Sequence, residues 1–215
     1  KYSPKTLICE KTGEEIIDQM RKLGFLSKED INDRISLTNL EAAKLSFYRN
    51  NISHLLIFES LICGFFQYQK EIAKEDLLQS IKMIYPFLKE EFFLKWDEAD
   101  LDQIIDLKLN KLLNKNLIFE DSDFFKRPDF KSKEFYETQS LGKLVQPSID
   151  RFYVLISQLW KNSEEHISKN ELERNSLEIL KNLEKTQARL TPEFSEKWMF
   201  DVFLSRLIEN KYVRE

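Results

Sequence analysis

Hydrophobic residues recur three and four positions apart along most of this chain, which is the spacing of an α-helix with one buried face. Examples are the series Ile81, Ile84, Tyr85, Leu88 and the apolar positions of 101–113. Such spacing, with the start and stop signals around it, predicts helices over a set of ranges. They are 13–23, 28–34, 39–49, 51–69, 74–85, 87–95, 99–115, 140–161, 169–189 and 193–210.

Capping residues mark several of these helix starts. In a capping box, a Ser or Thr side chain and an acidic or amide side chain three residues later satisfy the first backbone N–H groups of a helix. Such pairs are Thr12–Glu15, Ser27–Asp30, Thr38–Glu41 and Ser168–Glu171. Thr191 followed by Pro192 is a further start, because proline suits the first helical position.

One segment departs from the helical spacing. In 116–128, "NLIFEDSDFFKRP", two short apolar runs flank an acidic turn, and this predicts a small β-hairpin. Helices followed by such a hairpin resemble a winged-helix unit. The segment 109–120, "LNKLLNKNLIFE", aligns with 204–215, "LSRLIENKYVRE", so a second, related unit is plausible.

These elements predict a mainly α fold: a multi-helical domain with one or two small β-hairpins and winged-helix-like subunits. We expect three parts, a helical block over 1–70, a helical unit ending in a hairpin over 71–128 and a C-terminal helical unit over 129–215. The polar stretch 126–140, which contains Pro128, is the expected linker or long surface loop.

Composition agrees with a folded helical protein. Hydrophobic residues are 42% of the 215 and charged residues 33%, and only four are glycine. A net charge of −4 argues against a nucleic-acid partner. Two distant cysteines, Cys9 and Cys63, are expected to be reduced thiols. Because the chain starts at Lys1, we expect a fragment, a processed product or a trimmed chain, without a visible signal peptide.

The apolar stretch 52–66 is too short to span a membrane and carries two polar residues, so a buried core helix is expected and the chain itself is expected to be soluble. The aromatic run 85–96, "YPFLKEEFFLKW", could lie on a membrane, but core or interdomain packing is the favoured interpretation. The helix over 98–114 begins with acidic residues, which would repel the phosphates of DNA.

Sequence motifs for catalysis, metal ions or cofactors are not found. Both histidines precede a glutamate by five residues, His54 with Glu59 and His166 with Glu171. A His-x-x-x-x-Asp pair serves acyl transfer when the carboxylate orients the imidazole. Five residues on one helix place two side chains roughly 140° apart, and Glu171 is already the expected capping partner. Neither pair is therefore expected to be catalytic.

The stretch 46–58, "SFYRNNISHLLIF", places polar side chains inside an apolar run. Burying such groups costs free energy unless each finds a partner. The candidate functional residues are Tyr48, Arg49, Asn50, Asn51 and His54.

This stretch resembles the "YRNN…H" segment of the bacterial membrane-associated glycerol-3-phosphate acyltransferases (PlsB type). Further stretches are similar in the same order: 83–96, "MIYPFLKEEFFLKW", 144–160, "LVQPSIDRFYVLISQLW", and 191–215, which begins "TPEF". The resemblance covers roughly residues 38–215 of this chain, and the similar segments lie in the C-terminal part of the proteins of that family.

The resemblance implies an enzyme that moves a fatty acyl group from acyl carrier protein or a coenzyme A thioester to glycerol 3-phosphate, forming lysophosphatidate at the cytoplasmic face of the inner membrane. It also implies that the catalytic His-x-x-x-x-Asp lies upstream, so this chain alone is expected to be inactive. The residues at 48–54 would then dock on the upstream catalytic domain or reach toward its substrate, or else form a network within this chain. The rivals are a tandem winged-helix module that binds protein and a module that binds nucleic acid.

Overall fold

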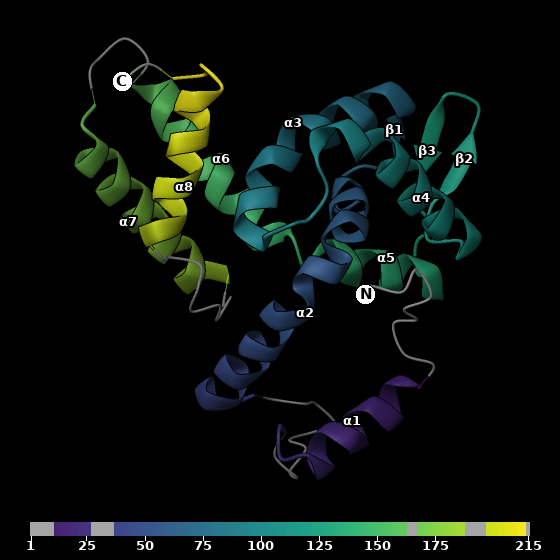
Figure 1. The fold of residues 1–215 in the computed structure, drawn as a ribbon. Helices are drawn as coiled ribbons and strands as arrows, with labels where there is room; N and C mark the ends of the chain where they lie inside the picture. Colours follow the sequence, from purple (N-terminus) through teal and green to yellow (C-terminus); the bar gives the residue numbers. More distant parts are fainter. Residues whose placement is uncertain (1–10, 27–36, 163–166, 188–196, 214–215) are drawn as a thin grey trace. The chain divides into compact units, whose positions relative to one another are not determined.

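A computed structural model describes residues 11–26, 37–162, 167–187 and 197–213. The chain forms two compact units, Lys1–Arg49 and Asn50–Glu215. The mainly α prediction is confirmed, and a small three-stranded antiparallel sheet accompanies the helices (Figure 1). The division into 1–70, 71–128 and 129–215 stays a prediction.

The first unit contains helix α1 (Gly13–Lys22) and the start of the long helix α2 (Asn39–Phe65). The predicted capping boxes form at both starts. Thr12 and Glu15 bind each other's backbone N–H groups, and so do Thr38 and Glu41. The predicted helix 28–34 and the box Ser27–Asp30 lie outside the described residues.

Two pairs of predicted helices are single helices in the structure. α2 runs through the predicted break near residue 50, and α3 (Lys74–Phe92) runs through Pro86. Proline lacks a backbone N–H, so we expected an end at Pro86. The helix continues because its buried face spans that point, with Ile81 and Tyr85 before the proline and Phe87 and Leu88 after it.

The second unit begins with a winged-helix arrangement. After α2 come strand β1 (Glu71–Ala73), α3, the short 3-10 helix η1 (Glu98–Asp100), helix α4 (Leu101–Asn114) and strands β2 (Phe119–Asp121) and β3 (Phe124–Lys126). β3 lies between β1 and β2 and pairs antiparallel with both. The predicted hairpin is confirmed, whereas β1, at three residues, gave no readable pattern in the sequence.

The predicted linker 126–140 is wrong, because it contains most of helix α5 (Lys133–Gly142). Ser132 caps this helix by accepting a hydrogen bond from the N–H of Phe135 at 3.0 Å. The hydroxyl of Thr138 is buried and donates to the carbonyl of Leu117 at 2.7 Å. The predicted single helix 140–161 is therefore two helices, α5 and α6 (Gln146–Lys161).

Three helices complete the second unit: α6, α7 (Lys169–Gln187) and α8 (Lys197–Glu209). α7 packs along α6 and α8 packs against α3. At the start of α7, Ser168 accepts a hydrogen bond from the N–H of Glu171 at 3.2 Å, as predicted. The predicted start at Thr191 and Pro192 lies outside the described residues.

The matched segments 109–120 and 204–215 end their helices in the same way. Asn116 and Lys211 occupy equivalent positions and have positive φ angles of 55° and 61°. The next N–H closes the turn in each case, from Leu117 to Leu112 at 3.0 Å and from Tyr212 to Leu207 at 2.9 Å. This shared geometry supports the match, although a second hairpin is not seen in the described residues.

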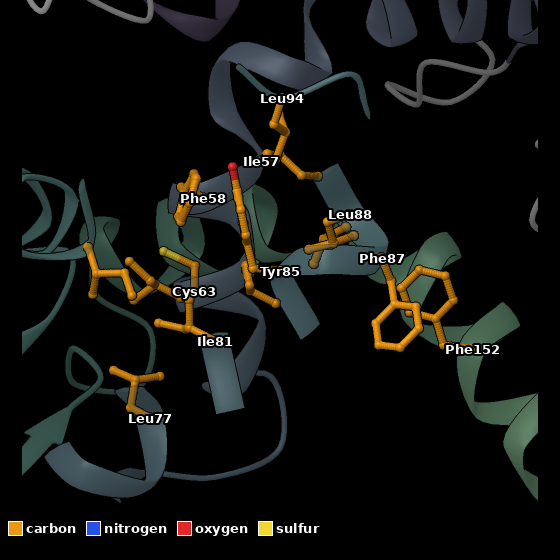
Figure 2. Packing of buried hydrophobic residues seen from close by; sticks show 14 of the residues in the cluster. Ile57, Phe58, Cys63, Leu77, Ile81, Tyr85, Phe87, Leu88, Leu94 and Phe152 are labelled. Carbon is orange, nitrogen blue, oxygen red and sulfur yellow. The ribbon is translucent and has the colours of Figure 1, made fainter. Parts of the chain in front are cut away.

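A continuous core joins the elements of the second unit. Tyr85 of α3 lies beside Phe58 of α2, and its hydroxyl donates to the carbonyl of Trp96 at 2.6 Å (Figure 2). Burial, together with the carboxylates of 97–100, raises the pKa of Tyr85 to about 12. The aromatic run 85–96 is core, as favoured from sequence, except that Phe93 is exposed.

Helices α2 and α5 meet so closely that only glycine fits at position 142. A Cβ there would lie 2.9 Å from the backbone carbonyl carbon and oxygen of Cys63. Gln67 and Gln139 hold the contact by donating to backbone carbonyls across it, at 3.0 and 2.9 Å.

We therefore expect Gly142→Ala to lower the free energy of unfolding by about 1–3 kcal/mol, the usual effect of overpacking. Gly64→Ala is the matched control, because its Cβ would meet Val145 at an ordinary 3.4 Å. That change should stabilise the chain by up to about 1 kcal/mol, since alanine is the better helix former. Urea denaturation of both variants measures the effects, and equal changes of the same sign would contradict the close approach.

Candidate functional site

The structure describes the side chains of three of the five predicted site residues of α2, namely Tyr48, Asn51 and His54. Tyr48 is 52% exposed, and its ring packs edge-on against Phe25 with centroids 4.9 Å apart. Asn51 is exposed, so the expectation that it lies inside apolar packing is wrong, while His54 is half-buried. The side chains of Arg49 and Asn50 lie outside the described part. The docking role of these five residues stays a prediction.

In the first His–Glu pair, the described partners of the carboxylate are lysines. His54 and Glu59 lie on the continuous helix α2, and the Glu59 carboxylate is bound by two lysines. His166 lies outside the described residues, and Glu171 caps α7.

A buried site with several charges is centred on Glu59, whose side chain is 1% exposed. Lys108 and Lys111 of α4 both donate to its Oε1 atom at 2.8 Å. Burial acts to raise the pKa of Glu59, but the charges and hydrogen bonds of the two lysines outweigh it and hold that pKa below its ordinary value. The site therefore keeps an ionised carboxylate between α2 and α4.

Two further groups extend this buried charge site. The Lys108 ammonium lies 5.9 Å from the ring centroid of Trp96, within the range of a cation–π contact. Cys63 lies one turn along α2 from Glu59, and burial with the nearby carboxylate raises the pKa of its thiol. A thiol held protonated in this way is a poor nucleophile, so the site is better suited to fixing helices than to chemistry.

A second buried ion pair joins α3 to α6. Arg151, 5% exposed, donates to Glu91, and Ser148 donates to the same carboxylate. Burial raises the pKa of Glu91, and the charge of Arg151 with the Ser148 hydrogen bond opposes that rise. The neighbouring Glu90 pairs with Arg206 of α8, so the end of α3 is tied to two helices.

These charges escaped sequence reasoning, although a signal was available. Lys108 lies on the buried face of α4 between Ile105 and Leu112, and Arg151 lies on the buried face of α6. A charged residue among the apolar positions of a helix points to a buried partner, because an unpaired buried charge is very unfavourable.

Exposed apolar side chains gather on the other face of α6. Tyr153 is 72% exposed, Ile156 48% and Trp160 82%. We call these three residues the α6 stripe. Their spacing of three and four places them on one face of the helix, opposite Arg151.

Other candidate sites are weaker. A hollow of about 560 Å³ lies along α7, but all its lining side chains come from that one helix, so it is not enclosed. Within the described ranges, no group of three or more His, Cys, Asp or Glu side chains is placed to hold a metal ion. None of the helices in those ranges combines the length and apolar character that crossing a membrane requires.

The family model for the "glycerol-3-phosphate acyltransferase C-terminal region" matches residues 1–215. The chain belongs to this family. The resemblance read from 38–215 is thereby confirmed and extends to the first residues as well.

Two similar relatives are both named glycerol-3-phosphate acyltransferase. The protein from Pseudomonas savastanoi pv. phaseolicola is 27% identical over 216 residues, which cover 100% of this chain and 26% of the relative. The protein from Pseudomonas aeruginosa strain PAO1 is 28% identical with the same coverage. The chain thus spans about a quarter of the length of these relatives. No solved structure matches it significantly.

Proposed function

We propose that this chain is the non-catalytic C-terminal region of an enzyme that acylates glycerol 3-phosphate, and that it packs on and supports the upstream catalytic domain. The observation that carries the proposal is the family match over all 215 residues, together with relatives of which those residues form only 26%. Most of each relative, and room for the catalytic machinery, therefore lies outside the matched part.

The proposed reaction joins a fatty acyl group to a hydroxyl of glycerol 3-phosphate. The hydroxyl oxygen attacks the thioester carbonyl of acyl carrier protein or coenzyme A, an ester bond forms, the C–S bond breaks, and the hydroxyl proton ends on the departing thiol. A general base must take that proton first. The buried carboxylates of this chain are poor candidates, because Glu59 and Glu91 are held in ion pairs.

The proposed supporting role fits the way the helices are fixed. Two buried ion pairs join α2 to α4 and α3 to α6, and such pairs favour one arrangement of helices over others. We place the full-length enzyme at the cytoplasmic face of the inner membrane, as the resemblance implies and as suits a lipid product.

A second candidate function is a winged-helix module that binds protein. The observation that favours it is the three-stranded sheet with the strand order β1-β3-β2, in which α3 and α4 follow β1 and precede β2 along the chain. The exposed residues of α4 and the hairpin include Asp102, Asp106, Glu120 and Asp121, and carboxylates at these positions do not favour binding to the phosphates of DNA.

We expect the full-length protein to form lysophosphatidate from glycerol 3-phosphate and an acyl thioester, and to keep that activity within a few-fold when His54→Gln or His166→Gln is introduced. The reason is that removing a general base lowers the rate by about 10²–10⁴-fold, and the proposal assigns that base to the upstream domain and not to either histidine. Initial rates with radiolabelled glycerol 3-phosphate measure the effect.

The control is the same protein with a catalytically dead upstream domain, which should show no product above background. Loss of activity by two orders of magnitude in a stably folded His54→Gln variant would place the chemistry in this chain. A full-length wild-type protein without acyl transfer would overturn the proposed activity.

A further inference from the structure

Among the residues that the structure describes, no contact gives the α6 stripe a structural role that would explain its composition. Helix α6 is anchored by Arg151, which lies on the opposite face and binds Glu91, and by Phe152, which stacks on Phe203 with centroids 4.2 Å apart. Tyr153, Ile156 and Trp160 could be polar without loss to that anchoring. Three large apolar side chains on an exposed face therefore call for something that covers them.

The size and residue types of the stripe fit a contact surface. At 72%, 48% and 82% exposure, its three side chains present on the order of 300–400 Å². Contiguous apolar patches of a few hundred Å² mark interaction sites, whereas single exposed apolar residues are ordinary. Trp and Tyr are also the residue types that contribute most to binding at the centres of interfaces.

The polar residues beside the stripe argue against a lipid partner. Asp150 and Lys161 carry opposite charges, and Gln146 donates to Asp150 at 2.7 Å. A helix that lies on an anionic bilayer needs an excess of Lys and Arg around its apolar face. The mixed charge around the α6 stripe fits the polar rim of a protein–protein contact better.

The size of the stripe favours a partner on the same polypeptide. A stable contact between separate proteins buries roughly 800 Å² on each side, about twice what the stripe offers. A covalently linked partner needs less, because its effective concentration is on the order of millimolar. The relatives supply such a partner, since this chain corresponds to only 26% of their length.

We propose that the α6 stripe, Tyr153, Ile156 and Trp160, is the surface on which the upstream part of the same polypeptide docks. This inference rests on the proposed function, which makes the chain one region of a longer enzyme. It adds which surface of the region meets the upstream part.

The test places the photoreactive residue p-benzoylphenylalanine at position 160 of the full-length protein in its native membranes. Phe93 is the matched control position, because it is an aromatic residue of 84% exposure that belongs to the end of α3 and not to the stripe. After irradiation, digestion and mass spectrometry, we expect cross-links from 160 to peptides of the upstream part, in several-fold higher yield than from 93.

Each other outcome at position 160 would overturn the inference: lipid adducts, links to a second copy, links to another protein, or reaction with solvent alone. Equal yields from 160 and 93 would overturn it too, since the contact would then not be specific. The cross-link is read independently of acyl transfer. A wild-type protein that cross-links as expected but forms no lysophosphatidate would therefore contradict the proposed function alone.

Discussion

Replacing Glu59 by methionine is expected to lower the free energy of unfolding of the chain by about 3–5 kcal/mol, as when one partner of a buried ion pair is removed. The loss arises because Lys108, whose side chain is 11% exposed, would lie in the core without its carboxylate partner. Lys111 is better placed to turn toward water, since 27% of its side chain is exposed. Urea denaturation with a fixed m-value measures the change.

The double variant Glu59→Met, Lys108→Met is the control that isolates the ion pair. Replacing a buried pair by apolar residues of similar volume is often neutral, so the double variant should regain most of the lost stability. If its loss equalled the sum of the two single losses, Glu59 and Lys108 would not be coupled. A loss below about 1 kcal/mol for Glu59→Met would show that the carboxylate is not buried as described.

The stability difference between wild type and Glu59→Met is also expected to depend on pH. The pKa of Glu59 is held below its ordinary value of 4.5, so its folded form binds a proton less readily than the unfolded chain. Its stabilising contribution is therefore fully present above pH 4.5 and is lost as the pH falls through the lower, folded-state pKa. The stability difference between wild type and Glu59→Met should shrink in acid, and a constant difference would contradict the lowered pKa.

The sequence predicted helices correctly where periodicity and capping residues agree. It failed where tertiary contacts decide whether a helix forms or continues. Thr12 and Thr38 cap helices as predicted because the capping box is local. The continuity of α3 through Pro86 could not be predicted locally, because the buried face on both sides of the proline sustains it. Helix α5 was missed although Ser132 is a good cap, since the charged and turn-forming residues around it indicated a loop.

The candidate site shows the same division. The polar stretch 48–54 stood out because it interrupts an apolar run, yet Tyr48 and Asn51 are exposed. The charges that are buried, Glu59 and Arg151, have their partners 49 and 60 residues away along the chain. No local rule connects positions so distant, although a charge on an apolar stripe showed that some partner must exist.

A second large loss of stability is expected when an aromatic residue is removed from the core of the C-terminal helices. Phe152 of α6 stacks on Phe203 of α8. It also lies beside Phe87 of α3, with ring centroids 5.9 Å apart, and Figure 2 shows these two rings. Phe152→Ala should lower the free energy of unfolding by about 3–5 kcal/mol, because it removes a buried ring and leaves a cavity where three helices meet. Urea denaturation of the chain measures it.

The next residue provides the matched control for this prediction. Tyr153 is also aromatic and stands on the same helix, but its ring is 72% exposed, so Tyr153→Ala should change the free energy of unfolding by less than about 0.5 kcal/mol. Similar losses from the two variants would mean that α6 is not oriented as described, with Phe152 in the core and the α6 stripe outward.

The same two variants also test the proposed contact in the full-length protein. If the upstream part covers the stripe, Tyr153→Ala should weaken that contact while the fold of the C-terminal region stays intact, whereas Phe152→Ala should disturb the contact only by unfolding the helices that present it.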